Sequence, residues 1–385
     1  DHRDLHSFPT RRSSDLIVWF ADSRQLQALC EHWLTLPWLA MDTEFMRTDT
    51  FYPVPALVQV NDGEANYLLD PRSIDDFAPL AKVMVAPSVQ KVLHACSEDL
   101  EVFQILLKCL PVNLLDTQVA AAFCGYGYSV GYANLVNAVL QIQLPKDETR
   151  SNWLQRPLTE AQQRYAALDV EYLHRLTVIL KAQLQELQRE SWVADECDLL
   201  INNFLESQKL SNASQRFRGA WRLNQWQLAA LMELAAWRDQ TAQSRDVVRS
   251  HVVRDKSLFA IAELLPSDIS QLRKIPELGD KSLRRYGEHI IEIVTAVRAM
   301  PEDTLPARLP RPPSSAQQAR INSMRDALAE LSAELKVAPE YLARRRDFEF
   351  MMRALQEGRS GDQLFPPGFN GWRAELVKPR LQKYL

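Results

Sequence analysis

Two acidic residues interrupt an apolar run near the start of the sequence. Asp42 and Glu44 lie in the segment LAMDTEF, whose other residues are mostly core-forming. In an extended strand, residues two apart point to the same face, so both carboxylates can meet there. A D-x-E pair also occurs by chance on an exposed strand face. Burying two unpaired carboxylates is costly, however, so the apolar setting favours a compensating cation.

Two further acids are candidate partners for this pair. Asp99 falls in the first turn of a helix expected after KVLHA, where it could simply stabilise the helix amino terminus, as could the adjacent Glu98. Asp169 follows Tyr165 by four residues on a later helix, so the two side chains are neighbours on one helix face. Asp169 stands at the edge of an apolar stripe, where packing alone would not select a carboxylate.

The segments that carry these acids predict an α/β domain with a mixed sheet. Three β-rich runs, LAMDTEF, ALVQVND and ANYLLD, predict consecutive, mostly antiparallel strands, the last two joined by a turn at Asp62-Gly63. KVLHA predicts a fourth strand, and Ser97 is expected to cap the helix after it. Thr159 and Gln162 form a capping-box pattern that opens the long helix of the last acid.

The remainder of the chain divides into helical segments and one unusual end. Residues 211–300 and 315–385 predict two small helical bundles, and residues 301–314, with five prolines, predict a semi-rigid linker. Residues 1–16 have no periodicity, and most of them resemble a translated sequencing-adaptor oligonucleotide. We therefore treat this segment as an artefact and expect the first domain to begin near residue 17.

The composition is that of a globular protein with more than one domain. Its 385 residues are 46% hydrophobic and 24% charged. The sequence shows no run near the roughly 18 apolar residues of a membrane helix and no secretory signal at its start, which predicts a cytoplasmic protein without membrane partners. Five scattered cysteines, without a C-x-x-C pair, favour neither disulfides nor a zinc site.

Charge is distributed unevenly along the chain. Residues 1–210 hold 17 basic and 28 acidic residues, residues 211–300 hold 14 and 10, and residues 301–385 hold 14 and 11. An acidic first half does not by itself attract a polyanion, whereas a basic second half can supply phosphate contacts. Ordinary solvated surface is the alternative interpretation.

Taken together, the acidic motifs resemble those of the exonuclease superfamily that uses four acids and a tyrosine. The blocks DTEFMRTDTFYP, HACSEDLEVF, LLDTQVAAAF, GYANLV and SNWLQRPLTEAQQRYAALDVEYL are similar, in this order, to bacterial ribonuclease D. The segment LRKIPELGDKSLRRYGEHII resembles the helicase-and-RNase-D carboxy-terminal (HRDC) domain. The resemblance covers residues 17–300 strongly and the last bundle more loosely. The Y-x-x-x-D form belongs to the tyrosine branch of the superfamily.

This resemblance implies a fold and an activity. It implies a ribonuclease-H-like catalytic domain in residues 17–207, a nucleic-acid-binding HRDC-like bundle in residues 211–300 and a second one in residues 315–385. It implies 3′→5′ hydrolysis of RNA to nucleoside 5′-monophosphates, in tRNA 3′ processing, by a monomer. The implied catalytic residues are Asp42, Glu44, Asp99, Tyr165 and Asp169, and the four acids would hold two Mg²⁺ or Mn²⁺ ions. Oxygen ligands suit these cations, and four carboxylates nearly balance their charge.

Several alternatives remain open at the level of the sequence. A DNA exonuclease would use the same acids, since no residue here demonstrates reading of the 2′-hydroxyl. A catalytically silent RNA-binding scaffold is a second alternative, against which the presence of all four acids and the tyrosine counts. Near the motifs, His94, Trp153 and Arg156 could contact substrate or could serve packing, Cys96 is expected in the core, and Arg344 to Arg346 are expected on a solvated helix face.

Overall fold

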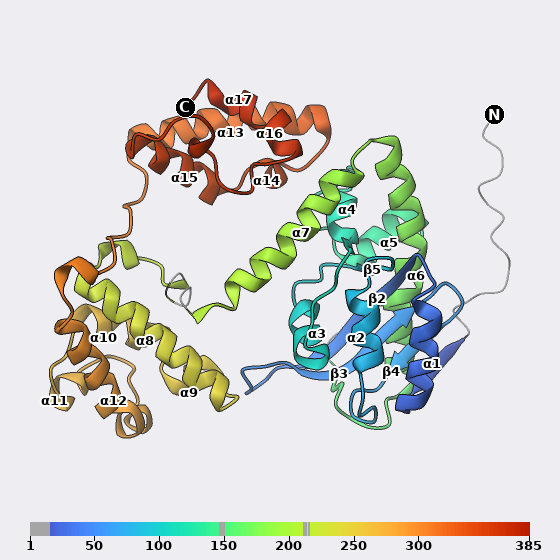
Figure 1. Ribbon diagram of the computed structural model, residues 1–385, viewed down its shortest axis with the longest axis horizontal. Coiled ribbons are helices and arrows are strands. Elements are labelled where there is room, and N and C mark those ends of the chain that lie inside the picture. The colour runs from blue at the N-terminus through green and yellow to red at the C-terminus, as the bar shows by residue number, and fades with distance from the viewer. Residues whose placement is uncertain (1–15, 146–150, 211–213, 215) are drawn as a thin grey trace. The chain divides into compact units, whose positions relative to one another are not determined.

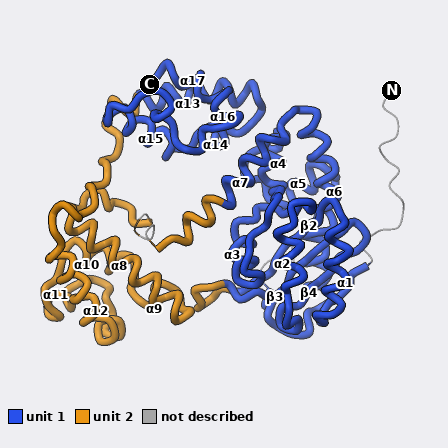
Figure 2. The backbone as a smooth tube through the Cα atoms, viewed as in Figure 1, with its two compact units in different colours: residues 1–46, 53–201, 320–385 blue, residues 47–52, 202–319 orange. Residues whose placement is uncertain are grey.

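The computed structural model describes residues 16–145, 151–210, 214 and 216–385. The predicted artefact therefore lies, apart from Leu16, outside the described residues. The chain divides into two compact units (Figure 2). Unit 1 comprises residues up to 46, 53–201 and 320–385, and unit 2 comprises residues 47–52 and 202–319.

Unit 1 is built on a mixed six-stranded sheet in the order β1-β4-β3-β2-β5-β6 (Figure 1). The strands are β1 (Ile17–Phe20), β2 (Trp38–Met46), β3 (Val54–Asn61), β4 (Asn66–Leu69), β5 (Gln90–Leu93) and β6 (Leu114–Asp116). The β2-β3-β4 ladder is antiparallel, as predicted, while β1, β5 and β6 pair in parallel with their neighbours. Strands β1 and β6 were not predicted, because each is held in the sheet by pairing with a strand distant in the sequence, which local patterns do not reveal.

Seven helices of the described chain surround this sheet or extend from it. They are α1 (Ser23–Trp33), α2 (Ala78–Val85), α3 (Asp99–Leu107), α4 (Thr117–Phe123), α5 (Tyr132–Leu140), α6 (Glu160–Glu186) and α7 (Glu190–Ser207). Helix α6 opens with the predicted capping box, in which Thr159 and Gln162 bond reciprocally. The predicted cap at Ser97 is wrong. Helix α3 begins at Asp99, and its N-cap position is Glu98, which makes no side-chain cap hydrogen bond.

The last bundle belongs to unit 1. It contains α13 (Ser315–Leu335), α14 (Pro339–Leu342), α15 (Arg345–Gln356), η5 (Gly361–Leu364), α16 (Trp372–Leu376) and α17 (Lys378–Gln382). Arg373 of α16 is buried and forms a two-pronged ion pair with Glu196 of α7. Beside it the Trp192 and Trp372 rings stack with centroids 5.1 Å apart. The bundle is therefore anchored to α7 by a buried, polar and aromatic contact.

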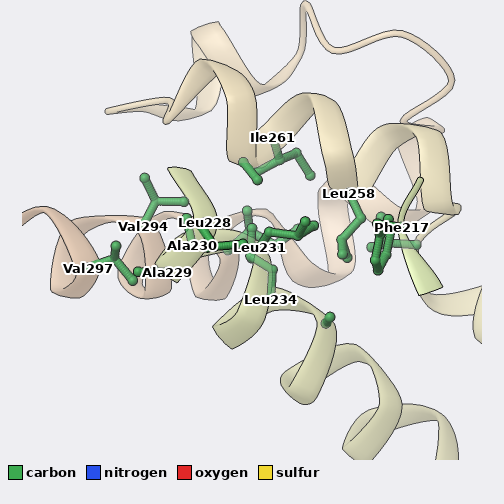
Figure 3. Close-up of a cluster of buried hydrophobic side chains, with 14 of the residues drawn as sticks. Phe217, Leu228, Ala229, Ala230, Leu231, Leu234, Leu258, Ile261, Val294 and Val297 are labelled. Carbon is green, nitrogen blue, oxygen red and sulfur yellow. The ribbon is translucent and has the colours of Figure 1, made fainter. Parts of the chain in front are cut away.

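Unit 2 is helical, as predicted for this segment. Its elements are η3 (Ala220–Arg222), α8 (Gln225–Ser244), α9 (Arg249–Val252), α10 (Asp255–Leu264), α11 (Ile269–Leu272), α12 (Asp280–Arg298) and η4 (Glu302–Thr304). Figure 3 shows the core, where Leu231 and Leu234 of α8 meet Leu258, Ile261 and Val294 from two other helices. Residues 305–314 form neither helix nor strand. Across the described part of the chain, no helix is long and apolar enough to span a membrane.

Candidate active site

Asp42 and Glu44 lie on one face of the central strand β2. In the β2-β3 register, Asp42 stands opposite Gln59 and Glu44 opposite Leu57. Leu57 packs with Ala166 of α6 in one buried cluster, so α6 covers this face of the sheet. The strand therefore presents both carboxylates toward the helix that carries Asp169, as the spacing of two predicts.

Asp99 reaches the site from the first turn of α3. Its side chain is 7% exposed, whereas the adjacent Glu98 is exposed. The Thr43 hydroxyl donates to Asp99 Oδ1 over 2.5 Å. Thr43 lies between the two acids of β2 and was not singled out by sequence analysis, because its contact joins residues 56 positions apart. Of the two neighbouring acids, the fold thus brings Asp99 to the strand pair.

Burial and neighbouring acids raise the pKa values of all four carboxyl groups. Burial and then the charges of Asp99 and Asp169 raise the pKa of Asp42 well above its usual range. Burial, Asp42 and Asp99 raise the pKa of Glu44 to about 9. Burial also raises the pKa of Asp99 to about 6 against the bond from Thr43, and burial, Glu44 and Asp99 raise the pKa of Asp169 strongly. Neighbouring buried carboxyls that cannot all ionise are a site for added positive charge.

The donor set fits hard divalent cations. All four side chains supply carboxylate oxygens, the ligands that Mg²⁺ and Mn²⁺ prefer, from β2, α3 and α6. Among the residues described, no three His, Cys, Asp or Glu side chains are already arranged to hold a metal ion. The four carboxylates are thus electrostatic neighbours with ligand chemistry that suits a divalent cation.

Tyr165 completes the group from one turn before Asp169. It lies half-buried on α6, with its ring centroid 6.0 Å from that of Trp153. Burial, followed by the charges of Asp169, Glu44 and Asp42, raises its pKa above the ordinary value. The phenol is therefore protonated at neutral pH, and its chemistry there is that of a hydrogen-bond donor rather than a base.

Asp116 holds the loop that leads into α3. Its carboxylate accepts hydrogen bonds from the backbone N–H groups of Ala95 (3.1 Å) and Cys96 (2.9 Å), and also from Gln118 (2.8 Å) in the first turn of α4. Ala95 has φ of 56°, a left-handed conformation that is costly for a residue with a Cβ atom. Sequence analysis missed Asp116, although Asp-Thr before a helix is an N-cap signal.

His94 and Cys96 have structural roles. The His94 ring nitrogens lie 2.9 Å from Thr117 Oγ1 and 3.1 Å from the Val130 carbonyl, so both have partners within the fold. Burial lowers the pKa of His94, which keeps the ring neutral. Cys96 is fully buried, as expected of a core residue. For His94, the packing interpretation is the one that the structure bears out.

Arg156 is likewise used inside the fold. Its guanidinium donates twice to Asp70, over 2.8 and 2.6 Å, and to the carbonyl of Ala56 over 2.6 Å. Trp153 is 2% exposed and packs in the cluster beneath α6. For Arg156 and Trp153, these contacts support the packing interpretation. The sequence left both interpretations open because it cannot show that Asp70, 86 residues earlier, lies beside Arg156.

Two of the three arginines at the start of α15 lie on a solvated face. Arg345 is exposed and pairs with Glu349 over 2.8 Å, and exposed Arg346 lies 3.9 Å from Asp347. The expectation of an ordinary charged helix face is confirmed for both. They also offer a matched set of exposed basic residues outside unit 2.

Comparison with known protein families agrees with this arrangement. Residues 17–185 match the 3′-5′ exonuclease family, and residues 227–294 match the HRDC domain family. The first match contains all four acids and the tyrosine, and the second lies within unit 2.

Individual relatives match along nearly the whole chain. The sequence is 42% identical to ribonuclease D of Pseudomonas paraeruginosa over 94% of this chain and 95% of that protein, and 36% identical to ribonuclease D of Escherichia coli over 94% and 96%. Among solved structures, the crystal structure of Escherichia coli RNase D, described as an exoribonuclease involved in structured RNA processing, superposes with a TM-score of 0.87 at 34% identity. That match covers 95% of this chain and 98% of the other.

Proposed function

The chain belongs to the ribonuclease D family and is a 3′→5′ exoribonuclease, and from this premise we propose how it works and on what. We propose that two divalent cations, Mg²⁺ or Mn²⁺, are held by Asp42, Glu44, Asp99 and Asp169. The proposed substrates are structured RNA precursors, such as tRNA precursors. The family is metal-dependent. The observation that carries the metal assignment is the cluster of four carboxyls, Asp99 buried and the other three partly buried, whose pKa values are raised by burial and by neighbouring acids.

The proposed chemistry divides between cations and protein. The four carboxylates would hold a pair of divalent ions, which would activate water and stabilise the leaving 3′ oxygen, so that nucleoside 5′-monophosphates are released. The protein residues supply orientation. Thr43 donates to one oxygen of Asp99 and so restrains the orientation of that carboxylate. Tyr165, protonated at neutral pH, donates to the scissile phosphate or to the attacking water and does not remove its proton.

The basic surface of unit 2 is proposed to hold the RNA body. Three adjoining hollows on this unit are linked by Ser250, Arg254 and Ser282, each of which lines two of them. The basic side chains that line them are Arg47, Arg216, Arg245, Arg249, His251, Arg254, Lys281 and Arg285. Two acids, Asp255 and Glu277, line the same hollows. A surface with this excess of cationic groups favours phosphate contacts that do not depend on sequence.

One assay tests the substrate and the metal together. RNA and DNA oligonucleotides of matched sequence, each with a 3′ overhang on a stem, are incubated with Mg²⁺, with Mn²⁺ or with chelator, and the products are identified by mass. We expect 5′-mononucleotides from RNA in the presence of either cation and none with chelator. Faster hydrolysis of DNA would favour the DNA exonuclease alternative. Tight RNA binding without any product would favour the silent scaffold.

A cytoplasmic monomer is the proposed working form. The five proposed catalytic residues all come from unit 1 of one chain, so the site needs no second subunit. Sedimentation at assay concentration measures this, and activity that rises with the square of protein concentration would contradict it.

A further inference from the structure

Gln59 has a buried side-chain amide that forms no hydrogen bond with the described residues. It lies in the middle of β3 between two valines, and its side chain is fully buried. Among the described residues, neither its Nε2 nor its Oε1 has a hydrogen-bond partner. A buried carboxamide that keeps both functions unused destabilises the fold, and such groups in native proteins call for an explanation. An apolar residue would suit a purely structural position better.

The sheet register places this amide next to the acid cluster. Gln59 stands directly opposite Asp42 in the antiparallel β2-β3 pair. Residues opposite each other in such a pair point to the same face, with Cβ atoms about 4.5–5.5 Å apart. Leu68, which faces Gln59 from β4, belongs to the cluster that packs beneath α6. Gln59 therefore lies on the floor of the site, within side-chain reach of the Asp42 carboxylate.

We propose that Gln59 is a positioning residue that orients Asp42 for metal binding. In this arrangement Nε2 donates to one oxygen of the Asp42 carboxylate and leaves the other oxygen for the cation. The inference rests on the proposed metal-binding role of Asp42. It also explains the unpaired amide, since its partner is the carboxylate in the rotamer that a cation selects.

The residue type fits this task better than the alternatives. A lysine or arginine at this place would donate to Asp42 but would repel the cations. A glutamate would add a fifth negative charge to a cluster whose members already oppose one another's ionisation. A neutral amide supplies a donor without changing the charge balance, and partners of this kind fix the orientation of metal ligands in other proteins.

The decisive variant is Gln59→Met in the full chain, which keeps a long side chain and removes both polar functions. We measure the melting temperature of the metal-free protein, the Mn²⁺ dissociation constant by calorimetry without RNA, and steady-state kinetics. We expect an unchanged or higher metal-free melting temperature, a Mn²⁺ dissociation constant raised by about ten- to a hundredfold, and a lower kcat that excess Mn²⁺ partly restores. The KM for RNA should stay within about twofold.

Controls separate this inference from repacking and from the metal assignment itself. Leu68→Met alters the same buried face without touching a polar group, so its Mn²⁺ affinity should remain normal. If Gln59→Met does not fold, Gln59→Leu replaces it in the same measurements. Unchanged Mn²⁺ affinity in the glutamine variant, with affinity lost in Asp42→Asn, would overturn the role of Gln59 alone. Unchanged affinity in Asp42→Asn would overturn the proposed metal site instead.

Discussion

Two groups of acidic side chains, Asp239 in unit 2 and the four-acid cluster of unit 1, differ in how their charge is compensated. In unit 2, Asp239 is buried beside Arg238. Its Oδ2 atom also forms ion pairs with Arg216 Nη2 at 2.5 Å and with Arg249 Nε at 3.0 Å. In unit 1, burial and neighbouring acids raise the pKa values of Asp42, Glu44, Asp99 and Asp169. Among the described residues, no basic side chain lowers them.

Asp239 is a charge that its arginine partners neutralise within the fold, whereas the four acids of unit 1 are proposed to be neutralised by bound cations. Removing one partner of a buried pair leaves the other uncompensated and destabilises the protein. Removing one of several like charges relieves repulsion. The same Asp→Asn change should therefore act in opposite directions on the stability of the two units.

The largest expected effect is on activity in unit 1. Asp42→Asn, Glu44→Gln, Asp99→Asn and Asp169→Asn should each lower kcat by about 10³-fold or more, beyond the loss of one preorganised donor. Each should leave the metal-free melting temperature equal or higher, because a repelling charge is gone. Asp239→Asn is the matched change in unit 2 and should lower the melting temperature while sparing kcat on short RNA. Loss with Glu98→Gln instead of Asp99→Asn would reassign that ligand.

A smaller loss of activity is expected when the tyrosine loses its hydroxyl. Tyr165→Phe keeps the ring against Trp153 and removes the donor, so kcat should fall by about 10²- to 10³-fold while KM and Mn²⁺ affinity change little. Tyr165→Ala should in addition lower the melting temperature, because the packing of the ring is removed. A fully active Tyr165→Phe enzyme would show that the residue serves packing alone.

Binding of long RNA should respond next, through unit 2. Arg254→Ala, Lys281→Ala and Arg285→Ala together should weaken binding of a structured RNA and make its salt dependence shallower, by about one in slope for each phosphate that is no longer neutralised. Hydrolysis of short unstructured oligonucleotides should be unaffected. The control is Arg345→Ala with Arg346→Ala on α15, which removes exposed basic residues outside unit 2. An equal effect of both sets would mean that charge acts non-specifically.

The last expected effect is on stability rather than on activity or binding, and takes the form of a dependence on pH. Because the pKa of Glu44 is raised to about 9 in the fold, the folded state binds more protons than the unfolded chain between about pH 4.3 and 9. The metal-free melting temperature should therefore decrease as pH rises through this window, and the decrease should flatten in Glu44→Gln. Added Mn²⁺ should oppose the loss increasingly toward high pH, since the carboxylates must be ionised to bind it. A melting temperature that rises over this window would contradict the assigned shift.

Much of the fold, and the residues of the candidate site, could be predicted from local sequence patterns. The β-rich runs of β2, β3 and β4 and the capping box at Thr159 are properties of short segments, and each is found where it was expected. The contacts of Thr43 with Asp99 and of Asp116 with Ala95 join residues 56 and 21 positions apart. No periodicity reveals such pairs. For the same reason, the sequence left the role of Arg156 open and did not predict that the last bundle packs on α7.

The packing of the last helical bundle on α7 has a consequence for the connectivity of the molecule. Because Arg373 and Trp372 bind the end of the chain to α7, residues 202–319 are an insertion whose two ends both return to unit 1. Because both ends of this insertion are covalently attached to unit 1, it can move only within a limited volume. Its effective concentration with respect to unit 1 is therefore raised. A single protease cut within residues 305–314 should consequently yield two fragments that still elute together, and separating them should require a denaturant that breaks the Arg373–Glu196 contact.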